Sequence, residues 1–402
     1  CGLAYPLSAT LSLIGAEGVF LLYSRSQTEG QRLLTCIPAM LLCYWCFGYG
    51  AWLCLALMLA AGIIVHHQKL SALLAAGILL LPATQYPATT WWSKPDLDRE
   101  YVLSLDVEHY FGNIQKMRKH LETDRQILWV TYYRNLYNAT HPSEINSPVS
   151  LSRNLLAWNQ PGTNGLILPV NPSASFLSIL FANELWFTLG DMTMAEHCAM
   201  LSMIFSPRNS GSRMIKRLAE INLVNGDDEA ALKYLRILDK TLLHKNWAEK
   251  RIPGLQTPRV KEWLEKKRRD IPTQDHLRSG NDAVTSLRNL VASNAGNLRA
   301  YEYLLCYHLL SKDLRSFVED YVPGKASSSI FAEALLIHLA RQGNIRAEEL
   351  IKYQIPVKIA KEFADYTRLY EAKDTSLKEK YGKTYWFYYH FATTEPGKES
   401  KP

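Results

Sequence analysis

The sharpest chemical motif in the sequence is a pair of cysteines separated by two residues, Cys43-Tyr-Trp-Cys46. Two thiols at this spacing can close a small disulfide and exchange it with a partner, which is the chemistry of thiol oxidoreductases. The pair lies in apolar sequence without a thioredoxin-like strand–helix–strand pattern, and the other cysteines form no matching second pair. Packing of small side chains is therefore the competing interpretation.

Three carboxylates offer further chemistry. Glu17 is the only charged residue in an apolar run from Leu3 to Tyr23, where burial of a carboxylate is costly and indicates transport or proton transfer. An interfacial position for Glu17 is the alternative. Asp96 and Asp98 directly follow the apolar region, where membrane glycosyltransferases place acidic residues that hold a metal or act as a base. The same pair also fits a helix N-terminus, where carboxylates meet the positive end of the helix dipole.

Histidines and cysteines of the remaining chain lie on helical, largely apolar patterns: His197 with Cys198, Cys306 with His308, and His338. No pair has the spacing of zinc ligands. We therefore predict satisfied core histidines, and neither a metal nor a cofactor.

The charges are distributed unevenly along the chain. Residues 1–92 hold three Lys and Arg and two acidic residues, whereas the whole chain holds 45 Lys and Arg and 38 Asp and Glu. The first part is thus almost free of charge, and the second has an ordinary globular composition. A net charge of +7 over 402 residues is a mild excess, so we predict no nucleic-acid partner.

The apolar part predicts several transmembrane helices, with the lipid bilayer as a partner. An uncharged run from Leu33 to Val65 would reach roughly 50 Å as one helix, which is too long for one crossing, and Gly48-Tyr49-Gly50 offers a turn at its centre. Trp91 and Trp92, at the end of the last apolar run, suit the membrane–water interface. We predict four crossings, over residues 3–23, 33–48, 51–65 and 70–92.

Four crossings would place the loops with Arg25, Arg32 and Lys69 on one face of the membrane. The positive-inside rule then predicts a bacterial inner-membrane protein whose soluble domain faces the periplasm, whereas three crossings would divide these loops between both sides. The chain begins at Cys1 without an initiator Met, so we also expect a truncated N-terminus.

From Lys94 onward, apolar residues recur at helical spacing and two similar hairpins follow one another. A helix closes on Gly190 and another on Gly226, and a small residue follows each glycine five positions later, Ala195 and Ala231. Glycine ends a helix in the left-handed conformation, and a small alanine allows the next helix to pack closely.

A looser third copy ends at Gly343, with Ala347 four residues later. The pattern resembles a tetratricopeptide-type helical repeat over 175–240 and 297–355, although the large aromatic expected early in each first helix is absent or displaced. The alternative is an irregular helical domain whose hairpins happen to end on glycine.

Together these patterns predict an all-α protein in which multi-pass transmembrane helices (1–92) precede a soluble helical-hairpin repeat domain (93–392) and a disordered tail (393–402). The basic segment Lys261–Arg269 is predicted to be a helix with a solvated face. The aromatic run Tyr385–Phe391 is predicted to pack into the core.

The segments Arg213–Asn222, Lys233–Leu235, Lys240–Leu242 and Trp247-Ala248 resemble a family of uncharacterised multi-pass membrane proteins of Bacteroides-type bacteria. The resemblance implies this architecture and a location in the bacterial envelope, and it brings no established activity.

The sequence favours a membrane-anchored scaffold, because stacked helix pairs form extended surfaces that bind proteins or peptides. The alternative is a membrane enzyme, of glycosyl transfer or thiol redox chemistry, with an accessory helical domain. A scaffold should tolerate, and an enzyme should not tolerate, substitution of the candidate site residues Glu17, Cys43, Cys46, Asp96 and Asp98.

Overall fold

The structure, a computed structural model, describes residues 97–122, 127–141, 151–156, 162–170, 176–205, 211–273 and 282–392. The chain divides into two compact units, Cys1–Leu103 and Ser104–Pro402. Helix α5 (Leu97–Tyr110) crosses this division, and its start is all that the structure describes of the first unit. All other described helices belong to the second unit.

The described elements are all helices, which confirms the all-α class for this part of the chain. The multi-pass transmembrane part of the prediction is not supported, since no described helix is long and apolar enough to cross a membrane. The assignment is therefore corrected to an all-α fold. The four predicted crossings within residues 1–92, and the predicted disordered tail 393–402, lie outside the described residues.

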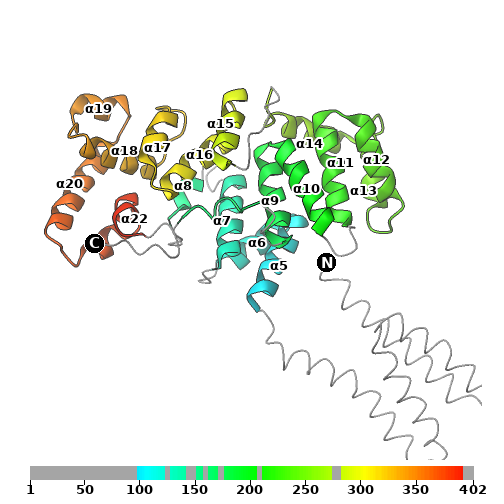
Figure 1. Ribbon diagram of the computed structural model, residues 1–402, viewed down its shortest axis with the longest axis horizontal. Helices are drawn as coiled ribbons and strands as arrows, with labels where there is room; N and C mark the ends of the chain where they lie inside the picture. The colour runs from blue at the N-terminus through cyan, green and yellow to red at the C-terminus, as the bar shows by residue number, and fades with distance from the viewer. Residues whose placement is uncertain are drawn as a thin grey trace, which may run out of the picture. The chain divides into compact units, whose positions relative to one another are not determined.

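Two helical hairpins stand side by side in the second unit (Figure 1). They comprise α9 (Phe176–Leu189) with α10 (Met192–Phe205), and α11 (Ser212–Asn225) with α12 (Asp228–Asp239). Gly190 and Gly226 separate the helices of each pair with φ of +89° and +82°, and Ala195 and Ala231 are fully buried. Both predicted features, a left-handed glycine at the helix end and a closely packed alanine in the next helix, are thus confirmed in the two hairpins.

Gly190 also brings the first hairpin close to a later part of the chain. A Cβ at this position would lie 2.2 Å from the carbonyl oxygen of Asp270, so only glycine fits. Asn297 donates hydrogen bonds from Nδ2 to both Leu189 O and Asp270 O, each at 2.8 Å. The end of α9 is therefore fixed by the residue that caps α16 (Leu298–Leu310).

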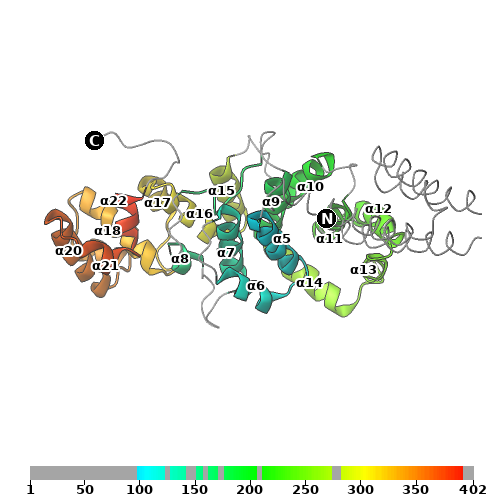
Figure 2. The same ribbon diagram turned by 90° about the horizontal axis from the view of Figure 1, so that it is seen from below.

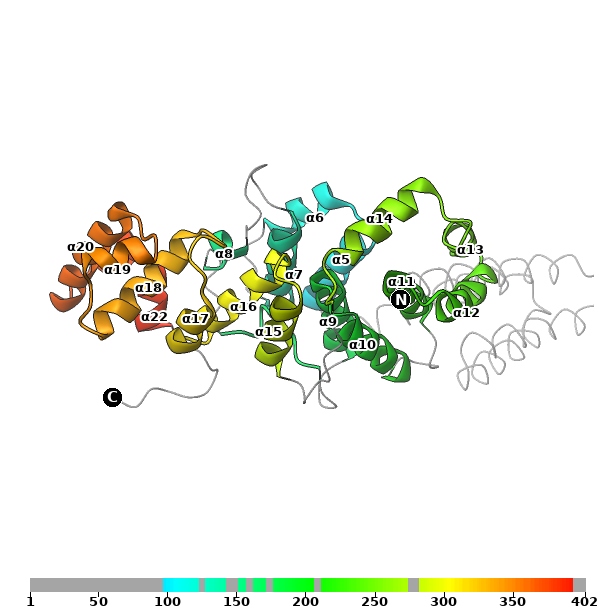
Figure 3. The same cartoon turned by 90° about the horizontal axis from the view of Figure 1, so that it is seen from above.

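Other helices pack around the two hairpins. The segment α13 (Lys245–Glu249) and α14 (Pro258–Arg268) leads from α12 back toward α9, as Figure 3 shows. α16 packs on α15 (Ala283–Ser293), α17 (Leu314–Asp320) and α8 (Leu151–Asn154). Upstream, α6 (Ile114–Leu121) packs on α7 (Leu128–Thr140), whose Tyr132 donates to Phe181 O of α9 at 2.5 Å.

The predicted third hairpin is wrong. Gly343 does adopt a φ of +63°, but Ala347 at the start of α19 (Ala347–Lys352) is exposed. α18 (Ser329–Arg341) instead packs on α20 (Val357–Glu371) and α22 (Tyr385–Phe391), which gather at the C-terminal end with α21 (Leu377–Tyr381) (Figure 2). The repeat-like packing is therefore found in the two hairpins α9–α12 and does not continue through α18 and α19.

The aromatic run near the C-terminus packs as predicted. It forms helix α22, in which Tyr385 and Trp386 are fully buried. The Trp386 ring lies 5.3 Å from that of Phe363 and 5.5 Å from that of Tyr366, measured between centroids, and its Nε1 donates to Glu333 O at 3.0 Å.

Candidate functional site

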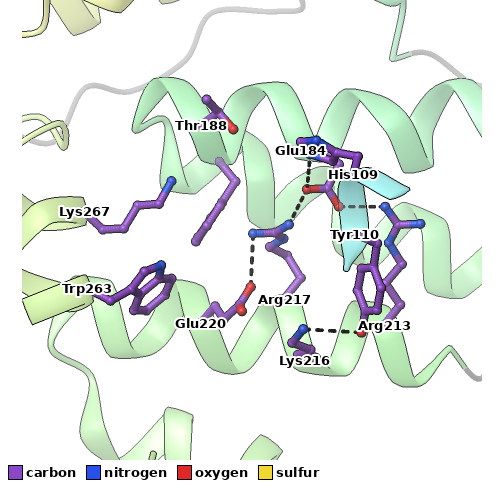
Figure 4. A pocket seen from close by; sticks show the side chains of 11 residues that line it. His109, Tyr110, Glu184, Thr188, Arg213, Lys216, Arg217, Glu220, Trp263 and Lys267 are labelled. Carbon is purple, nitrogen blue, oxygen red and sulfur yellow. Dashed lines mark hydrogen bonds and ion pairs between the residues drawn. The ribbon is translucent and has the colours of Figure 1, made fainter. Parts of the chain in front are cut away.

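A pocket of about 230 Å³ opens between the last turn of α5 and helices α9, α11 and α14 (Figure 4). All of its lining residues belong to the second unit. Its walls are dominated by charged and aromatic side chains: His109, Tyr110, Glu184, Phe187, Thr188, Arg213, Lys216, Arg217, Glu220, Trp263 and Lys267. We call this the cationic pocket.

Helical spacing explains why these side chains converge. Arg213, Arg217 and Glu220 are separated by four and three residues on α11, so they share one face of that helix. Trp263 and Lys267 are four residues apart on α14 and share a face in the same way. In Figure 4, the labelled side chains of α14 point toward those of α11 across the pocket.

One wall of the pocket is an ion-pair network centred on Arg213. Its guanidinium donates to both oxygens of Asp106, at 2.5 and 2.8 Å, and to Glu184 Oε1 at 2.8 Å. Asp106 also accepts a 2.6 Å hydrogen bond from the Tyr133 hydroxyl behind it. Burial alone would lower the pKa of Arg213, but Glu184 and Asp106 outweigh it and raise that pKa well above its ordinary value.

Glu184 continues the network to a second arginine. Its Oε2 accepts from Arg217 Nη2 at 2.5 Å and lies 3.6 Å from His109 Nε2. Burial would raise the pKa of this carboxyl, but Arg217 and Arg213 together hold it well below its usual range. Arg217 also pairs with Glu220 at 3.1 Å. Both arginines are thus committed to protein carboxylates.

Lys267 lies at the opposite wall without such a partner. Its ammonium is 4.5 Å from the centroid of the Phe187 ring, and the guanidinium of Arg217 lies 3.9 Å from the same centroid. Within the part of the chain that the structure describes, Lys267 forms no ion pair. Burial, followed by the positive charges of Arg217 and Arg299, lowers the pKa of Lys267 to about 8.

Lys216 is a second ammonium group that lacks a carboxylate among the described residues. It lies 4.4 Å from the Tyr110 ring centroid and 5.1 Å from that of Trp247, and donates a long 3.4 Å hydrogen bond to the Tyr110 hydroxyl. Burial, as the largest cause, lowers its pKa.

The charges of the pocket do not cancel. Four cationic side chains, Arg213, Lys216, Arg217 and Lys267, face the two lining carboxylates Glu184 and Glu220. Asp106, bound to Arg213 from behind, brings the carboxylates to three and leaves one positive charge in excess. A pocket of this composition can accept one anionic group.

The predicted site residues do not contribute to this pocket as far as the structure describes them. Glu17, Cys43, Cys46 and Asp96 lie outside the described residues. Asp98 is exposed in the first turn of α5, which is the helix N-terminus that the sequence offered as an alternative. The proposed chemical roles of these five residues therefore stay predictions.

The predicted core histidines have mixed outcomes. His308 is buried and its Nε2 lies 2.8 Å from Asp320 Oδ2, which confirms a satisfied core histidine. His197 is exposed, because it faces outward from α10, whereas the adjacent Cys198 is buried. The prediction that His197 is a core histidine is therefore wrong. His338 is half-buried. Among the described residues, no cluster of His, Cys, Asp and Glu is arranged to hold a metal ion.

Sequence reasoning missed the cationic pocket. One signal was available: Glu184 stands alone as a charge in the apolar helix 176–189, and a buried carboxylate demands a cationic partner. The predicted solvated face of Lys261–Arg269 is confirmed, since most residues of this segment, Lys266 among them, are exposed, whereas the neighbouring Lys267 is half-buried. Helical spacing places Lys267 on the same face as Trp263 and Leu264, but one sequence does not reveal that this face meets α9 and α11.

No curated protein and no solved structure matches the chain. A family match covers residues 1–392, and that family is described as "Family of unknown function (DUF6057)". This confirms the predicted resemblance to an uncharacterised family, whereas the predicted Bacteroides-type source stays a prediction. Because the match spans nearly the whole sequence, the chain belongs to the family of unknown function DUF6057.

Proposed function

We propose that the second unit is a helical scaffold that binds a protein or peptide partner, and that the cationic pocket accepts an acidic group of that partner. The observation that carries the proposal is the excess positive charge of the pocket, where Lys216 and Lys267 have no carboxylate partner among the described residues. A carboxylate bound there would gain charge-assisted hydrogen bonds in a partly desolvated site.

The surrounding fold supports this proposal. The hairpins α9–α10 and α11–α12 supply a rigid platform, since Gly190 and Asn297 fix the end of α9 and the ion pairs of Glu184 join α9 to α11. Arg213 and Arg217 are already ordered by protein carboxylates, so their orientation does not have to be created when a ligand binds. Preorganised cationic walls suit recognition of one acidic side chain or a peptide C-terminus.

The enzyme alternative stays a prediction, because four of its candidate residues lie outside the described residues; the fifth, Asp98, is exposed. The predicted envelope location, the periplasmic side and the bilayer partner likewise depend on residues 1–92 and stay predictions.

Binding of short peptides to the full chain tests the proposal. We would compare two fluorescent peptide libraries with blocked ends, identical except for a central Glu in one and a central Gln in the other. The Glu library should bind more tightly, and Lys267→Ala should weaken that binding by about tenfold, as expected for a lost charge-assisted hydrogen bond.

Lys266→Ala is the matched control, because Lys266 precedes Lys267 on α14 and is exposed. It should leave binding unchanged. Equal binding of the Glu and Gln libraries, or equal effects of Lys266→Ala and Lys267→Ala, would overturn the proposed function.

A further inference from the structure

We propose that Lys267 is a nucleophilic amine that forms a Schiff base with a small aldehyde or ketone carrying a carboxylate. This inference rests on the proposed function, because the same pocket must accept the carboxylate. It goes further in giving Lys267 a covalent role.

The surroundings of Lys267 favour an amine that is free to react. Its ammonium lies over the Phe187 ring rather than against a carboxylate, and the stacked pair of Phe187 and Trp263 forms an apolar wall beside it. Arg217 presents a second positive charge to the same ring. The ring stabilises the ammonium less than a paired carboxylate would, while burial and the charge of Arg217 oppose the charged form, which is how buried lysines become nucleophiles in proteins.

The protonation equilibrium of Lys267 agrees with this geometry. The pKa of Lys267 is lowered to about 8 by burial and neighbouring cations, compared with an ordinary value of 10.5. At pH 7, about one in ten Lys267 side chains is then neutral, compared with about three in ten thousand for an ordinary lysine. A less basic amine is also a weaker nucleophile, so the net advantage is smaller than this ratio, and we expect roughly tenfold or more.

The carboxylate of the carbonyl compound provides selectivity. The pocket carries one positive charge in excess when the Lys267 nitrogen is protonated, as the ammonium or as the protonated imine, so a single carboxylate then neutralises it. In the reaction, the Lys267 nitrogen forms a bond to the carbonyl carbon, and the carbonyl oxygen leaves as water with the two amine protons. The imine nitrogen then takes up a proton from solvent, and this protonated imine keeps the positive charge that the ligand's carboxylate neutralises in the cationic pocket; no oxidant or reductant is consumed.

Reductive trapping on the full chain tests the inference. Glyoxylate, an aldehyde with a carboxylate, would be added at pH 7 with cyanoborohydride, which delivers hydride to the imine and fixes the label. After digestion, tandem mass spectrometry measures the label at each lysine. We expect Lys267 to be labelled at least about tenfold more than Lys266, its exposed neighbour.

Acetaldehyde serves as the matched neutral aldehyde, and its preference for Lys267 over Lys266 should be weaker. Similar labelling of Lys267 and Lys266 by glyoxylate would overturn the nucleophile, and an equal preference with acetaldehyde would overturn selectivity for the carboxylate. Because both lysines are compared within one wild-type molecule, no variant has to fold.

Competition by acetate separates this inference from the proposed function. Acetate cannot form an imine, but it should slow labelling of Lys267 by acetaldehyde if the pocket accepts a carboxylate. Protection by acetate without selective labelling by glyoxylate would leave the proposed function standing and remove the nucleophile. Selective labelling of Lys267 by glyoxylate without protection by acetate would leave the nucleophile standing and remove the proposed function.

Discussion

Two regions of the second unit bury a glutamate in opposite ways. In the ionic region, formed by α9, α11 and α14, Glu184 faces Arg213 and Arg217. In the aromatic region, formed by α18 and α20–α22, Glu333 accepts a hydrogen bond from the Tyr385 backbone N–H at 2.5 Å. The pKa of Glu184 is held well below its usual range, whereas burial raises that of Glu333 to about 7.

The difference shows that burial by itself does not decide the state of a carboxyl group; the facing donors decide it. A guanidinium stabilises the carboxylate by both charge and hydrogen bonds. One backbone N–H only partly offsets desolvation, and the negative charge of Glu362 raises the pKa of Glu333 further. The ionic region therefore stabilises a charged carboxylate, and the aromatic region depends on packing.

Removing the central ring of the aromatic region should have the largest effect. Trp386→Ala deletes a fully buried indole that contacts Phe363, Tyr366 and Tyr381. We expect the free energy of unfolding to fall by about 4 kcal/mol, measured by denaturant titration. Phe391→Ala is the control, because Phe391 of the same helix is half-exposed and should cost far less. Similar losses for both variants would contradict a packing-dominated region.

Breaking the ionic region should cost somewhat less. Arg213→Met keeps the length of the side chain but leaves Asp106 without its cationic partner and removes one of the two arginines from Glu184. A loss of about 3 kcal/mol is expected, because breaking a buried ion pair leaves uncompensated charge. Hydrogen exchange should localise the loss to α9 and α11. Arg236→Met on the exposed side of α12 controls for a generic loss of charge, and the idea fails if it is equally destabilising.

The two glutamates also predict opposite dependence on pH. Glu333 keeps its proton in the folded state up to about pH 7, whereas its ordinary pKa is 4.5, so the aromatic region should lose stability as pH rises from about 4.5 to 7. Glu184 has a lowered pKa, so its contribution is present above the ordinary value of 4.5 and is lost as pH falls below it.

Glu333→Gln should remove the first dependence, because the amide cannot ionise yet can accept from Tyr385 N. The wild type should be about 2 kcal/mol less stable in the aromatic region at pH 8 than at pH 5, and the variant should be nearly unchanged. Protection factors from hydrogen exchange in α20 and α22 measure this. Glu371→Gln, an exposed change on α20, should keep the wild-type profile; a flat wild-type profile would disprove the assignment.

The sequence predicted the local turns better than the contacts between distant segments. Gly190 and Gly226, each followed by an alanine, were identified correctly because helix ends and small-residue contacts are encoded within a few positions. The same pattern at Gly343 was misleading, because α18 is covered by α20 and α22 rather than by the next helix. Tertiary packing, which depends on residues far along the chain, decided that case.

The cationic pocket shows the same limit more strongly. It joins α5, α9, α11 and α14, so its residues span positions 109 to 267. Spacing on one helix predicts that Arg213, Arg217 and Glu220 share a face, but it cannot state that Glu184 or Lys267 lies opposite. Lys267 forms no ion pair among the described residues, and the cost of its charge to stability can be measured directly.

Lys267→Met should have the smallest effect on stability and the opposite sign. The lowered pKa of Lys267 means that the folded state disfavours its charged form at pH 7, and this penalty should decrease as pH rises through about 8 toward 10.5. Replacing the ammonium by a thioether of similar length should therefore stabilise the protein by about 1 kcal/mol at pH 7.

Lys266→Met provides the comparison, since it removes the same charge from an exposed position of the same helix and should leave stability within about 0.5 kcal/mol. A residue that lowers stability and whose removal weakens binding of the Glu peptides is retained for function rather than for the fold. If Lys267→Met instead destabilised the protein, its ammonium would be a structural part of the ionic region. The proposal that the cationic pocket binds an anion requires that Arg213 and Arg217 are paired with carboxylates and Lys267 is not. That difference would then be lost.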